Sequence, residues 1–132
     1  MTDAAPSQQF GPSRRLLKAA DYRRVFDQAE ARASHRHLLL LARRNEAADH
    51  RLGLVIAKKH VRLAVQRNRI KRLTREFFRQ QHTSAPTLDV ILLARRGLGE
   101  LDNADLSSIL QQQWQKLTRH ASTLEPITGR DT

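Results

Sequence analysis

The sequence predicts an α+β fold in which helices pack on a small mixed β-sheet. Apolar residues recur at helical intervals in three segments, and short apolar runs typical of strands lie between them. The resulting order is helix, strands, helix, strand, helix, the pattern of helices layered on a sheet. Because the chain has 132 residues and polar ends, we expect a disordered tail over residues 1–13, a single domain over residues 14–120 and a flexible tail over residues 121–132.

In the first half of the domain, the sequence predicts one helix and two strands. Apolar residues at three- and four-residue intervals indicate a helix over Ala20–Ala31, with Asp21 as its cap. The apolar runs Arg36–Arg43 and Arg51–Ala57 flank a polar segment. This is the pattern of two antiparallel strands joined by a loop.

The second half predicts a long helix, a buried strand and a third helix. The segment Leu63–Gln80 has neither Gly nor Pro, and we expect its stripe of Ile70, Leu73 and Phe77 to face the sheet. Leu88–Ala94 holds an uninterrupted apolar run, which indicates a strand buried on both faces.

The last helix follows a turn. Gly97 and Gly99 are turn residues in this interpretation, because no phosphate-binding glycine fingerprint surrounds them. Asp102 or Asn103 then caps a helix whose apolar residues share one face.

Charge is the most unusual property of the chain. Its 24 Lys and Arg face 13 Asp and Glu, for a net charge of +11. Such an excess favours a polyanionic partner, nucleic acid first and an acidic membrane surface second. The absence of cysteine excludes disulfides and thiolate metal sites. No signal peptide or bilayer-length apolar run is present, so we expect a cytoplasmic protein that does not enter a membrane.

The predicted middle helix concentrates this charge on one side. Its cations and one amide form two neighbouring rows: Arg67, Lys71 and Arg75, and Asn68, Arg72 and Arg79. Glu76 is the only acid in the segment and can pair with Arg72 or Arg79. Like charges four residues apart cost a helix about 0.2–0.5 kcal/mol per pair, so the isolated helix gains nothing from this pattern.

A nucleic acid is the partner that the pattern favours over the alternative of a solvated surface helix, which would intersperse both signs. Phosphates reward a row of cations because each contact releases a counterion. The guanidinium suits phosphates and unpaired bases, and the amide of Asn68 can reach a base edge or a 2′-hydroxyl. Lys58, Lys59 and Arg62 extend the positive surface upstream.

Two ordered blocks of residues resemble a known family. Arg51–Lys59 and Ala64–Leu73 look like the signature of the bacterial ribonuclease P protein, whose hallmark is Arg67-Asn68-Arg69. The resemblance spans about residues 16–120 and extends to both ends of the domain, through Tyr22, Phe26, Ala94–Gly97 and Leu101–Asn103. A lone Arg-Asn-Arg would be weak evidence for the family, but the long ordered block together with its flanking residues is strong evidence.

The resemblance implies a fold and a function. The fold is the ribonuclease P protein-like one (ribosomal protein S5 domain 2-like), with the order α-β-β-β-α-β-α and a left-handed crossover through the middle helix. The implied protein does not cut RNA. A large catalytic RNA with bound Mg²⁺ removes the 5′ leader of precursor tRNA, and one protein binds each RNA.

The resemblance also implies site residues. Those expected to contact the catalytic RNA are Arg62, Arg67, Asn68, Arg69, Lys71, Arg72 and Arg75. Those expected to hold the single-stranded leader, in a cleft between the basic helix and the sheet, are Tyr22, Phe26, Lys58, Lys59, Arg95 and Arg96. Leu38–Leu41 departs from the family pattern, because its side chains are aliphatic where other members carry aromatic ones. No catalytic or metal-binding residue is expected.

Several residues have a second interpretation. Phe78 lies beside the cationic rows, so either a neighbouring loop covers it or it faces a base. Tyr22 and Phe26 would be core residues without the resemblance. His35 and His37 have the spacing of a metal pair, but no third ligand is near in sequence.

Two other functions stay open at this point. A structural, ribosomal-type RNA-binding protein would carry the same charge pattern. A DNA-binding regulator would place the basic helix in a major groove, but a strand, not a helix with a short turn, precedes that helix.

Overall fold

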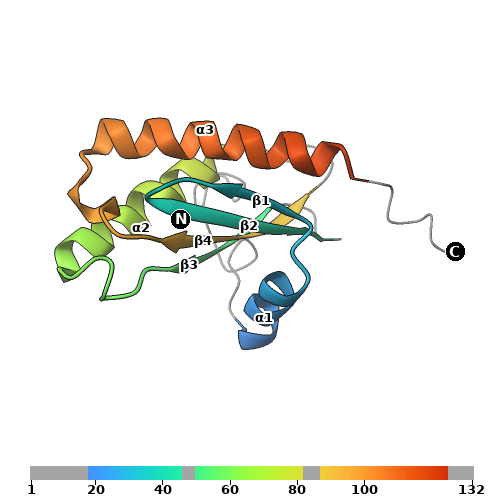
Figure 1. The fold of residues 1–132 in the computed structure, drawn as a ribbon, viewed down its shortest axis with the longest axis horizontal. Coiled ribbons are helices and arrows are strands. Elements are labelled where there is room, and N and C mark those ends of the chain that lie inside the picture. Colours follow the sequence, from blue (N-terminus) through green and yellow to red (C-terminus); the bar gives the residue numbers. More distant parts are fainter. Residues whose placement is uncertain (1–17, 46–49, 82–86, 125–132) are drawn as a thin grey trace, which may run out of the picture.

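The computed structural model describes residues 18–45, 50–81 and 87–124, which form a four-stranded sheet with helices on both faces (Figure 1). The elements are α1 (Ala19–Asp27), β1 (Ala31–Ser34), β2 (Leu38–Arg44), β3 (Arg51–Val55), α2 (Ala64–Arg79), β4 (Leu88–Ala94), a short 3-10 helix η3 (Leu98–Glu100) and α3 (Asn103–Ser122). The α+β class and the order α-β-β-β-α-β-α are confirmed. The expected tail over residues 1–13 lies outside the described residues, as does the expected tail over residues 121–132 except for its first four residues, of which two belong to α3. The domain boundaries stay predictions.

The sheet is mixed and has the strand order β1-β2-β4-β3. β2 pairs antiparallel with both β1 and β4, whereas β3 and β4 are parallel neighbours. The chain passes from β3 to β4 through α2, so this helix is the crossover of a parallel pair. Parallel neighbours place their carboxyl ends at one edge of the sheet, and this edge becomes important for the site.

The strand β4 separates two apolar layers. Val90 and Leu92 belong to the main core, which the sheet forms with α2 and α3. Ile91 points to the opposite face, where it packs with Val25 of α1. All three β4 side chains are fully buried, so the expectation of a strand buried on both faces is confirmed.

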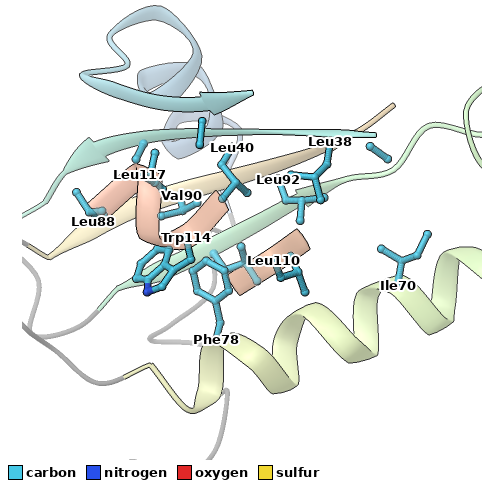
Figure 2. Close-up of a cluster of buried hydrophobic side chains, with 14 of the residues drawn as sticks. Leu38, Leu40, Ile70, Phe78, Leu88, Val90, Leu92, Leu110, Trp114 and Leu117 are labelled. Carbon is cyan, nitrogen blue, oxygen red and sulfur yellow. The ribbon is translucent and has the colours of Figure 1, made fainter. Parts of the chain in front are cut away.

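The face of α2 that packs inside differs from the expected stripe. Ile70, Thr74 and Phe78 are fully buried, while Leu73 and Phe77 are only partly buried. The reason is that α2 packs on α3 as well as on the sheet, which turns its buried face toward Phe78. Figure 2 shows Phe78 and Trp114 beside each other in the core. Their ring centroids lie 5.0 Å apart. Phe78 is therefore a packing residue, buried against Trp114 of α3.

The expectation of one helix through Ala31 is wrong. α1 ends at Asp27, and Ala31–Ser34 forms the edge strand β1, in which Ala31 and Ala33 are buried. Ala31 and Ala33 are too small to give a clear strand pattern, and the helical spacing of apolar residues continues as far as Ala31. The cap is also different, since Lys18 precedes α1 and Asp21 lies in its first turn.

Other local expectations are close to the structure. The remaining predicted helix and strand bounds differ by at most two residues. Asp102 is the cap of α3, because its carboxylate accepts the backbone N–H of Asp105 at 2.8 Å. Gly97 has a φ of 90°, a conformation that favours glycine, and so turns the chain as expected. No helix in the described part of the chain is long and apolar enough to span a bilayer.

Candidate nucleic-acid interface

The outer side of α2 forms a shallow groove of about 380 Å³. Its lining consists of Asn68, Lys71, Arg72, Arg75, Glu76 and Arg79. Four of these, Asn68, Lys71, Arg72 and Arg75, were expected to contact RNA. Within the described residues, their side chains have no hydrogen-bond or ion-pair partner. The groove therefore presents three cations and an amide that are free to bind a ligand.

The acid in this groove lies at its end. The carboxylate of Glu76 accepts hydrogen bonds from Nε of Arg79 at 3.2 Å, from Nη2 of the same residue and from Nε2 of Gln80 at 3.2 Å. The hydrogen bond with Arg79 lowers the pKa of Glu76. Of the two partners expected for Glu76, Arg79 is correct. Arg72 consequently keeps its charge uncompensated by this acid.

Arg69 is held by the protein itself. Its Nε donates to the side chain of Gln66 at 3.0 Å, and its Nη1 donates to Oδ1 of Asn103 at 2.7 Å. Its Nη2 donates to the carbonyl oxygens of Gly99 at 3.1 Å and Leu101 at 2.8 Å. All three guanidinium nitrogens are thus engaged, and they tie α2 to the turn that precedes α3.

Arg67 is engaged in part. Its Nη1 donates to the carbonyl oxygens of Val61 at 3.0 Å and Arg62 at 2.8 Å, so it stabilises the turn before α2. No signal in the sequence distinguishes this role from that of Arg72, because both are cations on one helix. The difference depends on which carbonyl groups the fold brings near each guanidinium.

A larger pocket, of about 960 Å³, lies beside the start of α2. Its charged lining comes from three segments and comprises Lys59, Arg62, Arg69, Arg96, Glu100 and Asp102. Lys59 and Arg96 were expected to bind the leader, and Arg62 and Arg69 the catalytic RNA. The structure therefore brings members of the two expected sets together in one pocket.

The parallel strands explain why these cations meet. β3 ends at Val55 and β4 ends at Ala94, and their carboxyl ends share one edge of the sheet. Lys58 and Lys59 follow the first strand, and Arg96 follows the second. These three side chains are exposed and have no hydrogen-bond partner among the described residues.

Arg95 differs from its neighbour Arg96. Its Nη1 donates to Oγ of Ser34 at 3.0 Å and to the carbonyl oxygen of His35 at 2.8 Å. These bonds hold the turn between β1 and β2 against the end of β4. Arg95 is thus engaged inside the protein, as Arg69 is.

Tyr22 and Phe26 lie on the opposite face of the sheet from α2. Tyr22 packs with the apolar cluster around Val25, and its ring covers Gly53, where an added Cβ would lie 2.8 Å from the ring. Phe26 is 43% exposed. These two rings therefore do not share a cleft between α2 and the sheet, because the main core fills that interface. Sequence reasoning missed Gly53, although a glycine inside a strand is itself a signal of a close approach.

The histidine pair stabilises a turn. The rings of His35 and His37 are 5.5 Å apart, and the backbone N–H of His37 donates to Nδ1 of His35 at 3.1 Å. Nδ1 of His37 lies 3.0 Å from the carbonyl oxygen of Arg96. Burial lowers the pKa of His35, with the nearby His37 adding to the effect. In the ranges 18–45, 50–81 and 87–124, no group of three His, Cys, Asp or Glu could hold a metal ion.

Two of the acids form structural pairs. Buried Asp89 accepts two hydrogen bonds from Arg51, at 2.8 and 2.7 Å, and this contact raises the pKa of Arg51. Glu30 accepts hydrogen bonds from Nε and Nη2 of Arg44, at 3.0 and 3.1 Å. These carboxylates stabilise strand ends and are not arranged around a common point.

Comparison with known proteins points to one family. The family model described as Ribonuclease P matches residues 10–118. The chain is 44% identical over 119 residues to the ribonuclease P protein component of Pseudomonas paraeruginosa, covering 90% of this chain and 88% of the relative. It is 47% identical over 114 residues to that of Azotobacter vinelandii, covering 86% and 87%.

Solved structures are similar as well. The RNase P protein of Staphylococcus aureus superposes with a TM-score of 0.70 at 27% identity, covering 77% of this chain and 93% of that one. The protein from Thermotoga maritima gives a TM-score of 0.62 at 25% identity, covering 85% and 98%. The whole fold, not a fragment of it, is shared.

Proposed function

Because this chain belongs to the bacterial ribonuclease P protein family, and so is a protein subunit of the ribonucleoprotein endoribonuclease that matures tRNA 5′ ends, we propose that it grips the RNA subunit through the outer face of α2. The observation that carries the proposal is the groove in which Asn68, Lys71, Arg72 and Arg75 have no partner among the described residues. One protein would bind each RNA in the cytoplasm.

The groove suits RNA for a physical reason. Three cations on adjacent turns repel one another in the free protein, and phosphates relieve this repulsion while releasing counterions. The amide of Asn68 lies among them and can both donate and accept, which suits a base edge or a 2′-hydroxyl. The groove is therefore expected to bind tightly at low salt and to weaken steeply as salt rises.

Arg67 and Arg69 have different roles in the proposed interface. Arg69 has all three nitrogens bonded within the protein, so we assign it to positioning α2 against α3. Only Nη1 of Arg67 is bonded within the described residues, which leaves its other nitrogens for the RNA. The Arg67-Asn68-Arg69 segment thus combines a contact surface with its own support.

The leader of precursor tRNA would run along the α1 side of the sheet and its carboxyl edge. Exposed Phe26 and half-buried Tyr22 offer rings there for unpaired bases, and Lys58, Lys59 and Arg96 offer cations for phosphates. Arg95 supports the neighbouring turn. In this proposal the chain binds and orients RNA, while the RNA subunit and its Mg²⁺ supply the chemistry.

The other two functions are not favoured. The family match decides against a ribosomal protein as the main role. A DNA-binding regulator would need a helix with a short turn before α2, whereas β3 precedes it.

Reconstitution tests the proposal. The purified chain should remove no leader from precursor tRNA by itself, and should raise leader removal when the RNA subunit of the same organism and Mg²⁺ are present. Arg72→Ala should weaken that effect at limiting protein. Cleavage by the protein alone, or full activity of the Arg72→Ala protein at every concentration, would refute it.

A further inference from the structure

Two large apolar side chains at the start of α2 face solvent. Leu63 is 59% exposed and Val65 is 69% exposed. The remaining large exposed apolar residue in the described chain is Phe26, which the proposed leader path already uses. Single exposed apolar residues are ordinary on protein surfaces, but these two are neighbours inside a strongly cationic region.

Leu63 and Val65 lie near both the larger pocket and the groove of α2. Val65 precedes Asn68 by three residues and Arg72 by seven, so on a helix it shares their outer face. Leu63 lies directly before α2 and lines the larger pocket together with Arg62. The apolar pair therefore lies between that pocket and the groove of α2.

The surroundings indicate what covers the pair. The first turn of α2 contains no acid, and the residue at its N-cap, Leu63, offers no side-chain hydrogen bond to it. Three of the nearby cations and amides, Arg62, Asn68 and Arg72, have no side-chain partner among the described residues. An apolar protein surface would meet uncompensated cations here, whereas an unpaired nucleotide offers an apolar base face attached to a phosphate.

We propose that Leu63 and Val65 pack against unpaired nucleobases of the RNA that α2 grips, and so add a salt-independent part to the affinity. The inference rests on the proposed function, because it concerns the same RNA. It adds a contact of a different physical kind: phosphate contacts weaken with salt, and burial of apolar side chains against a base does not.

Matched variants separate the two kinds of contact. Val65→Ala removes two methyl groups while raising helix propensity, and Val65→Ile keeps the apolar area. Leu63→Ala and Leu63→Met form a second pair, and Arg72→Ala serves as the phosphate-contact reference. The probe is the RNA subunit of ribonuclease P from the same organism, and its Kd is measured over a series of salt concentrations.

The two alanine variants at the apolar positions should weaken binding by about threefold to tenfold at every salt concentration, with the slope unchanged. Val65→Ile and Leu63→Met should bind like the wild type. If Arg72→Ala lowers the slope but Val65→Ala and Leu63→Ala bind normally, the inference is wrong and the proposed function stands. If Arg72→Ala also leaves binding unchanged, the proposed function fails.

A second copy of the chain is the other possible occupant. The same proteins are therefore examined for self-association by sedimentation without RNA. Self-association that Val65→Ala abolishes, together with unchanged RNA affinity, would assign the patch to an interface between copies and overturn the inference. A monomeric wild-type protein with the expected losses of affinity would support it.

Discussion

The guanidinium of Arg69 donates a hydrogen bond to Oδ1 of Asn103 at 2.7 Å, which joins the first half of α2 to the first residue of α3. Further bonds from the same group reach two backbone carbonyl groups in the preceding turn. A residue of the Arg67-Asn68-Arg69 motif therefore acts on the geometry of the protein before any RNA is bound.

Arg69→Lys should lower the free energy of unfolding by about 1–3 kcal/mol, because lysine keeps the charge but cannot reproduce the fork of hydrogen bonds. Urea unfolding of the free protein measures this. Arg72→Lys is the matched control, since it changes an exposed groove residue in the same way and should alter stability by less than about 0.5 kcal/mol. Equal stabilities of the two variants would contradict the assignment of Arg69 to holding α2 in place and of Arg72 to the groove.

Phe78→Ala should lower the free energy of unfolding by about 3–5 kcal/mol, because it empties the space beside Trp114 in the core. Phe26→Ala, at a ring that is 43% exposed, should cost much less. Chemical denaturation of both variants gives the comparison. A stable Phe78→Ala protein that binds RNA poorly would instead place the ring in the RNA interface.

Gly53→Ala should displace the ring of Tyr22, since the new Cβ would lie 2.8 Å from ring atoms at the free end of that side chain. The fold should tolerate this shift, but leader recognition should suffer. Tyr22→Ala should remove a base contact worth roughly 1–3 kcal/mol.

The readout for both variants is the KM of the reconstituted enzyme for precursor tRNA with a long leader against one with a single leader nucleotide. The advantage of the long leader should shrink in both. Wild-type leader dependence in Tyr22→Ala would show that the leader takes another path.

Glu30→Gln should flatten the acid side of the stability curve. The hydrogen bond from Arg44 holds the pKa of Glu30 below its ordinary value of 4.5. The folded state therefore binds this proton less readily than the unfolded state, so the stabilisation is present above pH 4.5 and is lost as the pH falls below it. Unfolding free energies at pH 7 and at about pH 4 should differ less in Glu30→Gln than in the wild type. Identical pH dependence in both proteins would rule out this role.

Helices and strands with a clear local pattern of apolar residues could be predicted from the sequence. The bounds of Leu88–Ala94 were predicted correctly, because an uninterrupted apolar run of strand length fits a strand buried on both faces. β1 could not be found in the same way, since Ala31 and Ala33 are buried but too small to give a clear pattern. The stripe of α2 was misplaced because its direction depends on α3, which lies far along the chain.

The candidate site also has a part that the sequence predicts and a part that depends on the tertiary fold. The rows of α2 follow from helical geometry alone, so Asn68, Lys71, Arg72 and Arg75 were expected together and lie together. The inward role of Arg69 could not be foreseen, because its partners Gly99 and Asn103 are 30 and 34 residues away in sequence. Local periodicity shows which side chains share a face, and only the tertiary fold shows which of them are already engaged.

The salt dependence of RNA-subunit binding tests the role of the α2 groove most directly. Arg72→Ala/Arg75→Ala should lower the slope of log affinity against log salt by about 1.4–1.8, the effect of two lost phosphate contacts. The control Lys116→Ala/Arg119→Ala removes two exposed cations from α3 and should keep the wild-type slope. A wild-type slope in the groove variant, or an equal loss in both variants, would contradict the assignment of α2 as the RNA-binding surface.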